Sequence, residues 1–366
     1  MYLKLFDIIA SITCSSLAIF SFFLIHKGRK NISNIILFVF FLVQLIVILD
    51  NLFVSIFEQS RVLLLQIVYL YYPFIFLWGP LLFFYVKSQV TASFKFRLID
   101  IVHFIPFVLV TIFIILYYYV PDYETKSNIV KKGLIYKYFF HLYFPYTFQL
   151  FSYNIAGIFL ITKYQRNIKN YCSVIEKRNL VWLKFVLFGY IIACLITFTI
   201  SFANVSQMIK MLASYVPYLI FFNILFYKAL IEPYVIIIPD EKPKYPNSNL
   251  DNADIQTYSK SIEQFFITKK PYLNPILTLS DLAKETGIPE KSISQVINQQ
   301  WNQNFFSFIN SYRIKEAKVK INNFNPNTDT LLGIAFDSGF NSKSSFYDVF
   351  KKQTGMTPTE YRKSQN

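Results

Sequence analysis

Apolar residues dominate the first two thirds of the chain, in long stretches with at most one charged residue each, separated by short loops that contain Lys and Arg. A helix that crosses the hydrocarbon core of a bilayer needs about 20 such residues. The stretches that satisfy this length are Phe6–Ile25, Asn34–Phe53, Val62–Val86, Leu98–Val120, Tyr138–Thr162, Leu183–Phe202 and Met211–Ile231. The pattern therefore predicts a bundle of seven membrane-spanning helices over residues 1–232.

The pattern changes after residue 232. Four prolines occur among Asp, Lys, Asn and Ser in residues 233–254, which is typical of an extended linker. From residue 255 onward, apolar residues recur three and four positions apart between polar ones, which predicts amphipathic helices in a water-exposed domain. We therefore expect an all-α protein with a membrane domain at 1–232, a linker at 233–254 and a second domain at 255–366.

One stretch of the second domain predicts two short helices joined by a sharp turn. Leu331, Ile334 and Ala335 share one helical face. Gly339 can adopt the left-handed backbone conformation that ends a helix, because it has no Cβ. The apolar positions that follow, Phe340, Phe346, Val349 and Phe350, predict the buried face of the next helix. This is a helix-turn-helix whose second helix presents polar side chains.

The same pattern occurs 52 residues earlier, where Leu279, Leu282, Ala283 and Gly287 match the first helix and its turn. A long amphipathic helix, from Phe305 to about residue 324, joins the two copies. Many helical hairpins share one such pattern, so a single copy would be weak evidence for a helix-turn-helix. Two copies in register around one joining helix are far more specific.

Residues Tyr258–Arg362 resemble the DNA-binding domain of AraC-type transcription regulators. The motifs that carry the resemblance are Leu279-x-x-Leu282-Ala283, Asn304-Phe305, Tyr312-Arg313-Ile314, Ala317, Ile334-Ala335, Gly339-Phe340, Phe346, Phe350-Lys351-Lys352, Gly355-Met356-Thr357-Pro358 and Tyr361-Arg362. The resemblance implies double-stranded DNA as a partner. Asn302 departs from it, because the family usually has Gly there, but Asn tolerates the left-handed conformation better than most residues. An apolar bundle joined to this domain is also similar in architecture to membrane-bound regulators of the Bacteroidetes type.

The resemblance makes Glu290–Gln300 and Ser342–Thr354 the recognition helices. The polar positions expected to face DNA bases are Lys291, Ser292, Ser294, Gln295 and Asn298 on the first, and Ser342, Lys343, Ser344, Tyr347 and Lys351 on the second. Gln and Asn can pair with adenine edges, and Lys can pair with guanine. Phosphate contacts are expected from Lys315, Lys318 and Lys352. For any one of these residues, a solvated surface position is the alternative.

The loops predict the orientation of the bundle. Those after the first, third and fifth stretches hold 11 Lys and Arg residues, and those after the second, fourth and sixth hold 6. Positively charged loops stay in the cytoplasm, so the N-terminus is expected outside and the DNA-binding domain inside. A nucleus would separate a membrane-anchored domain from DNA, and a bacterium has no such barrier, so the bacterial inner membrane is the expected location.

Composition agrees with a lipid-embedded chain, since 54% of the residues are hydrophobic and 16% are charged. The net charge of +15 does not by itself indicate DNA binding. Residues 1–250 hold 22 basic and 10 acidic residues, whereas residues 251–366 hold 14 and 11. Most of the surplus of positive charge is therefore expected to set the membrane topology and to contact anionic lipid headgroups.

Chemistry-bearing residues are sparse. Cys14, Cys172 and Cys194 fit no disulfide or metal-site spacing, and no catalytic motif is present, so we expect no enzyme, cofactor or metal. Uncharged polar residues inside the expected spans are Gln44, Gln149, Asn154 and Asn223. Such residues either link helices by hydrogen bonds or line a ligand pocket, and both alternatives stay open.

These patterns predict a one-component, membrane-anchored transcription regulator whose bundle senses an unknown small-molecule or peptide signal. A homodimer is one way in which the signal could change the placement of the DNA-binding domain. In a second hypothesis the bundle is a transporter or receptor and the C-terminal domain docks proteins. In a third, proteolysis within Pro233–Asp254 releases the domain. The sequence does not indicate whether the protein activates or represses transcription, or which operator it binds.

Overall fold

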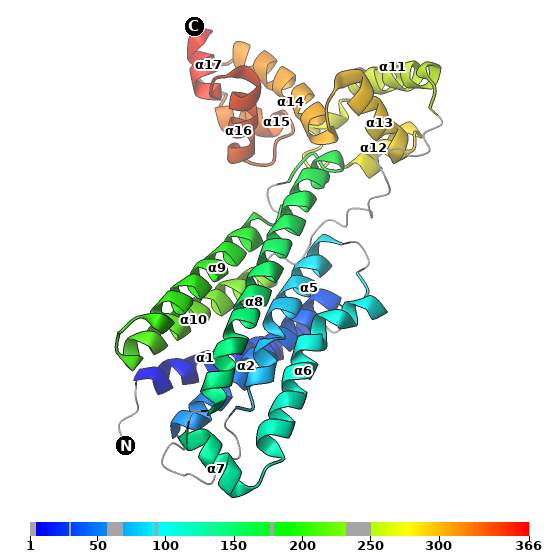
Figure 1. Cartoon of the computed structure of the whole chain (residues 1–366). Coiled ribbons are helices and arrows are strands. Elements are labelled where there is room, and N and C mark those ends of the chain that lie inside the picture. The colour runs from blue at the N-terminus through cyan, green and yellow to red at the C-terminus, as the bar shows by residue number, and fades with distance from the viewer. Residues whose placement is uncertain are drawn as a thin grey trace. The chain divides into compact units, whose positions relative to one another are not determined.

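The computed structural model describes residues 5–28, 31–56, 69–91, 94–132, 134–175, 179–231 and 250–365. The chain separates into two compact units. We name residues 1–162 with 180–237 the N-terminal unit, and residues 163–179 with 238–366 the C-terminal unit. The described residues form helices and no named strand, with one isolated β-bridge between Cys172 and Thr278, as the predicted all-α class requires (Figure 1).

The N-terminal unit consists of long apolar helices. Its elements are α1 (Leu5–Gly28), α2 (Ile32–Ile56), α4 (Tyr72–Ile75), α5 (Trp78–Val90), η1 (Leu98–Phe104), α6 (Ile105–Ile114), η2 (Ile115–Tyr119), α7 (Tyr123–Lys131), α8 (Leu134–Asn167), α9 (Val181–Phe202) and α10 (Gln207–Ile231). The last residues of α8, 163–167, belong to the C-terminal unit. Large apolar side chains on these helices face outward: Phe22, Phe148 and Phe185 are 69%, 75% and 71% exposed. Such a surface suits a lipid environment.

Four described helical segments are long and apolar enough to cross a membrane: Asp7–His26, Ile32–Phe53, Leu98–Tyr119 and Val181–Ile200. Each coincides with one of the seven predicted spans, and Tyr215–Ile231 is a shorter apolar helix. These segments suggest a multi-pass membrane domain.

The remaining predicted spans look different. Residues 62–68 of Val62–Val86 lie outside the described residues, and the described part consists of a turn, α4 with Pro73 near its beginning, and α5. The stretch Tyr138–Thr162 lies within the continuous α8, which contains Pro145. The count of seven therefore stays a prediction.

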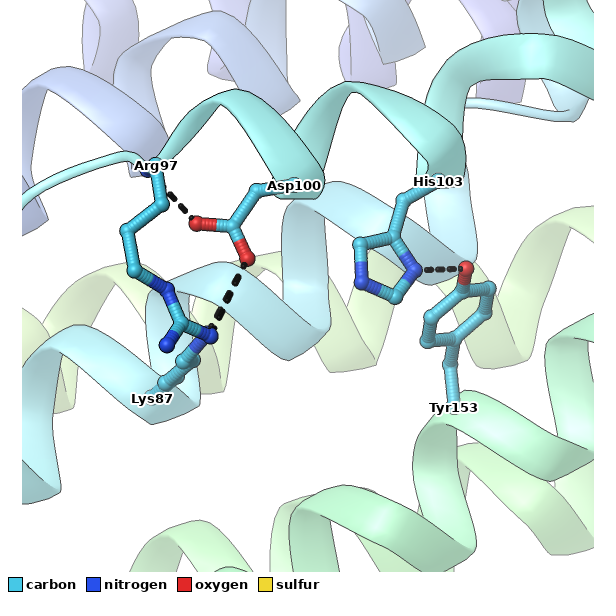
Figure 2. A network of polar contacts seen from close by, with 5 residues as sticks. All are labelled: Lys87, Arg97, Asp100, His103 and Tyr153. Carbon is cyan, nitrogen blue, oxygen red and sulfur yellow. Dashed lines mark hydrogen bonds and ion pairs between the residues drawn. The ribbon is translucent and has the colours of Figure 1, made fainter.

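Polar contacts connect α5, η1 and α8 within the N-terminal unit (Figure 2). The buried carboxylate of Asp100 accepts a hydrogen bond from the backbone N–H of Arg97 at 2.8 Å and pairs with the Lys87 ammonium at 3.3 Å. The Nδ1 atom of His103 lies 2.7 Å from the hydroxyl of Tyr153. These contacts attach η1 to its neighbours near both of its ends, through Asp100 in its first turn and His103 in its last.

The C-terminal unit contains the two predicted helix-turn-helix pairs. Its elements are η3 (Ile168–Asn170), α11 (Asn252–Lys269), η4 (Pro271–Leu273), α12 (Leu279–Thr286), α13 (Glu290–Trp301), α14 (Phe305–Asn322), α15 (Leu331–Asp337), α16 (Lys343–Thr354) and α17 (Pro358–Ser364). Of the predicted linker, residues 233–249 lie outside the described residues.

Helix α14 belongs to two hydrophobic cores. Phe305, Phe308 and Ile309 pack with α11, α12 and α13 into the first core. Further along the same helix, Ala317 and Ile321 pack with α15 and α16 into the second. One rigid helix therefore carries both helix-turn-helix units, and Figure 1 shows the two groups at its opposite ends.

Candidate nucleic-acid interface

The first helix-turn-helix consists of α12 and α13. Thr278 caps α12 by accepting a hydrogen bond from the backbone N–H of Asp281 at 3.2 Å. Gly287 ends α12 with φ +71°, and its N–H donates to the carbonyl oxygen of Ala283 at 2.9 Å. At the end of α13, Asn302 has φ +49°, so it occupies the left-handed conformation that the sequence led us to expect. The turns of this unit are thus set by local backbone chemistry.

Most of the residues predicted to face DNA on α13 lie on its accessible side. Lys291 is exposed, and Ser292, Ser294 and Asn298 are partly exposed. Ile293, Val296 and Ile297 are buried beneath them. The helix therefore presents a polar face opposite an apolar one.

Gln295 is a correction to the predicted set, because its side chain is only 4% exposed. Its Nε2 donates to the Oε1 of Gln299 at 3.5 Å. Helix α13 packs against α11, α12 and α14, so the covered part of its surface is wider than the apolar positions alone indicate. Gln299 and Gln300, which are outside the predicted set, are exposed at the end of the same helix, and Gln299 follows Lys291 by about two helical turns.

The second helix-turn-helix consists of α15 and α16. Ser342 is the N-cap of α16: its Oγ accepts from the backbone N–H of Ser345 at 3.1 Å and lies 3.2 Å from the Oγ of Ser344. This hydroxyl therefore has a structural role in addition to the predicted contact with DNA. Lys343, Ser344 and Lys351 are exposed.

Tyr347 is held more firmly than its predicted outward position implies. Its ring packs against the second core and its hydroxyl lies 3.2 Å from the Oγ1 of Thr359. The ammonium of Lys343 lies 5.5 Å from the centre of that ring, which is within range of a cation–π contact. Tyr347 can therefore orient Lys343 on the surface of α16.

The three lysines predicted to contact phosphate lie on α14 and α16. Lys315 and Lys352 are exposed and Lys318 is partly exposed. Lys315 lies over the ring of Tyr312 at 5.3 Å and Lys318 over that of Tyr361 at 5.5 Å. Aromatic rings thus support two of these ammonium groups while leaving them able to meet an anion.

Arg313 connects the two helix-turn-helix units and is fully buried. Its Nε donates to the carbonyl oxygen of Tyr272 at 2.8 Å, and its Nη2 donates to that of Asn274 at 2.8 Å. The guanidinium lies 5.8 Å from the ring of Phe340, at the turn of the second unit. A Cβ on Gly339 would collide with the carbonyl oxygen of Tyr272. The turn at Gly339 in the second helix-turn-helix is therefore packed directly on the first.

Glu316 lies beside this joint. Tyr272 donates its hydroxyl to Glu316 at 3.1 Å, and the Lys270 ammonium pairs with the same carboxylate at 3.2 Å. Burial, together with the Glu316 carboxylate, raises the pKa of Tyr272 to about 12. The tyrosine therefore stays a neutral donor throughout the physiological range.

The predicted intramembrane polar residues fall into different environments. Gln149 links two elements, since its Nε2 donates to the carbonyl oxygen of Phe76 at 3.3 Å. Asn154 and Asn223 donate to their own helices, and Asn223 is exposed rather than between helices. Gln44 is fully buried, and within the described part of the chain its amide has no hydrogen-bond partner. No group of His, Cys, Asp and Glu among the described residues is arranged to hold a metal ion.

Residues 282–364 match a protein-family model described as a helix-turn-helix domain. Over 86 residues the chain is 34% identical to an uncharacterized HTH-type transcriptional regulator of Staphylococcus aureus, covering 24% of this chain and 11% of that protein. Over 123 residues it is 26% identical to the melibiose operon regulatory protein of Escherichia coli, covering 31% of this chain and 39% of that one. A solved structure of a Listeria innocua protein of unknown function has 26% identity and a TM-score of 0.26, covering 30% of this chain and 97% of that chain.

The chain spans only about a tenth of the length of the S. aureus regulator that it matches. All of the similarity to the named regulators falls on less than a third of this chain. Within that part, the C-terminal domain is a helix-turn-helix domain of the AraC type. The named relatives are transcription regulators, which agrees with the expectation of a protein that is not an enzyme.

Proposed function

We propose that this protein is a membrane-anchored transcription regulator that binds specific double-stranded DNA through α13 and α16. The observation that carries the proposal is the pair of accessible polar helix faces held by the shared helix α14. Recognition helices of this kind enter successive major grooves about 34 Å apart on one face of the duplex. A rigid connection between the two helices supports that mode of binding.

The accessible side chains divide into two sets by their chemistry. Base contacts come from Lys291, Ser292, Ser294 and Asn298 on α13, extended by Gln299 and Gln300, and from Lys343, Ser344 and Lys351 on α16. Phosphate contacts come from Lys315, Lys318 and Lys352 and set the register without reading sequence. Ser342 and Tyr347 shape the beginning of α16 and contribute contacts through its first turn.

The N-terminal unit anchors the regulator in a bacterial inner membrane, with seven spans, the N-terminus outside and the DNA-binding domain in the cytoplasm. Four long apolar helices with outward-facing Phe side chains and the excess of Lys and Arg in alternate loops support this placement. The bundle senses a small-molecule or peptide signal, and a homodimer transmits it. The buried amide of Gln44, which lacks a partner among the described residues, supports a polar ligand within the bundle.

The proposal is tested with the full-length protein in lipid nanodiscs. Selection from random duplexes should yield a motif with two half-sites, and binding to it should weaken linearly on a log–log plot as salt is raised. Failure to enrich any sequence would contradict specific DNA binding. Transport of a solute into vesicles by a protein that ignores DNA would instead support the transporter hypothesis. A C-terminal reporter active only in the periplasm would contradict the topology.

A further inference from the structure

A short segment between α8 and α9, Tyr171–Val174, packs into the DNA-binding unit, and we name it the docking segment. The backbone N–H of Leu279 donates to the carbonyl oxygen of Tyr171 at 3.0 Å, and that of Ser173 donates to the carbonyl oxygen of Leu277 at 3.2 Å. With the bridge between Cys172 and Thr278, the segment pairs like a strand with the residues that begin the first helix-turn-helix. In the sequence, this stretch lies in the predicted loop between the spans Tyr138–Thr162 and Leu183–Phe202.

Ser173 is the centre of the contact, and it is 2% exposed. Its hydroxyl donates to the carbonyl oxygen of Leu277 at 2.6 Å and accepts from the Nη2 of Arg313 at 3.2 Å. Its carbonyl oxygen accepts from the Nη1 of Arg313 at 3.3 Å. The docking segment therefore supplies two acceptors to the guanidinium that holds the two helix-turn-helix units together.

Withdrawal of the segment would change the environment of Arg313. A buried charged donor that loses its acceptors is costly, so Arg313 would have to recruit water or leave its position. Either change loosens the packing of Gly339 and Phe340 against the first unit. The relative placement of α13 and α16 then depends on whether the segment is docked.

The segment is also tied closely to a helix of the N-terminal unit by chain connectivity. Helix α8 ends at Asn167, and only η3 (Ile168–Asn170) separates it from Tyr171. Ile168 is fully buried and η3 packs against α14. Three residues span at most about 10 Å when fully extended, so a shift of the end of α8 cannot be absorbed by slack in the chain.

We infer that the joint of the two helix-turn-helix units, at Leu277, Thr278 and Arg313, is an interaction surface for residues 171–174, through which displacement of α8 alters DNA binding. This inference rests on the proposed function, since it identifies how the N-terminal unit regulates the DNA-binding helices. The docked segment holds the recognition helices at one spacing. Withdrawal of the segment releases that spacing.

Docking is tested by the reactivity of Cys172, which is 1% exposed. The full chain with Cys14→Ala and Cys194→Ala keeps a single thiol and is treated with a maleimide in nanodiscs. Slow labelling is expected relative to the denatured protein. Ser173→Pro removes the N–H and hydroxyl donors to Leu277 and should speed labelling by about tenfold, and Ser173→Ala by a smaller factor. Ser261→Ala, at an exposed serine of α11, is the matched control and should have no effect.

Coupling is tested by DNA binding of the same variants. Ser173→Pro and Ser173→Ala should lower affinity for the selected duplex and tolerate inserted base pairs between the half-sites better than the parent protein does. Labelling of Cys172 at the denatured rate in the parent protein would overturn docking. Unchanged affinity and spacing preference in both Ser173 variants would overturn coupling. If the parent protein binds no DNA, the proposed function fails, while the labelling result still decides whether the segment docks.

Discussion

Arg313 and Ser173 lie 140 residues apart in the chain, yet the Arg313 guanidinium donates to the carbonyl oxygen of Ser173 at 3.3 Å and to its hydroxyl at 3.2 Å. Arg313 lies on α14, between the residues of the two hydrophobic cores. Ser173 lies between α8 and α9 in the chain, and it belongs to the C-terminal unit together with Arg313. The C-terminal unit therefore includes residues outside the last third of the chain, which is the part that resembles known regulators.

A peptide of residues 163–179 should stabilise a fragment of residues 250–366. The fragment alone lacks Ser173, so it leaves Arg313 without two of its acceptors. Each 1 kcal/mol of stabilisation raises the Tm of a domain of this size by about 4 °C. Differential scanning fluorimetry with increasing peptide measures the shift. A Ser173→Pro peptide is the control, and an equal shift with both peptides would contradict the prediction.

Gly339→Ala should destabilise the DNA-binding unit more than Gly355→Ala. Both glycines have positive φ, at +89° and +80°, so both substitutions cost backbone strain of about 1 kcal/mol. Only at Gly339 does the added Cβ also meet the Tyr272 carbonyl oxygen, whereas nothing lies within 4 Å of it at Gly355. The measurement compares the denaturant concentrations at which the two variants of the 250–366 fragment are half unfolded, in the presence of the 163–179 peptide. Equal midpoints would show that the two helix-turn-helix units are not packed as described.

Lys343→Ala should weaken binding to the selected duplex by about 1–3 kcal/mol and relax preference at one base pair, because Lys343 is exposed on the recognition face. Gln295→Ala should instead lower stability while leaving sequence preference intact, because the side chain is buried. Repeated duplex selection with each variant distinguishes the two effects. A changed preference with Gln295→Ala would return that residue to the base-reading set.

Lys352→Ala should weaken binding to all duplexes alike. Loss of one phosphate contact reduces the slope of log affinity against log salt by about 1. Fluorescence anisotropy between low and high salt gives the slope for the selected and a scrambled duplex. Lys363→Ala, a change of the same type on α17, serves as the comparison. A sequence-dependent effect of Lys352→Ala would assign it to base contact instead.

The helix-turn-helix units could be derived from the sequence because their determinants are local. The predicted turns at Gly287 and Gly339 have positive φ, and most of the predicted apolar positions are buried, with Leu331 and Val349 partly buried. The recognition helices begin and end within about one residue of their predicted limits. Periodicity and turn residues act over a few positions, and a single sequence displays them directly.

Burial on α13 was harder to predict. Gln295 follows Lys291 by one helical turn, so its position in the helix alone suggests exposure. Contacts of α13 with three neighbouring helices decide otherwise. The polar character of Gln295 therefore gave no sign that the packed face of α13 extends to this position.

The sequence by itself determined the helical class, the apolar stretches and the duplicated DNA-binding pattern, because each depends on residue spacing within one element. Only the tertiary structure decided that Ser173 completes the hydrogen bonds of Arg313 and that residues 163–179 belong with the C-terminal unit. Those contacts join backbone carbonyls, a hydroxyl and one guanidinium across a long separation in the chain. Hydrogen bonds of that kind impose no periodicity, so they become visible only when the folded chain brings their partners together.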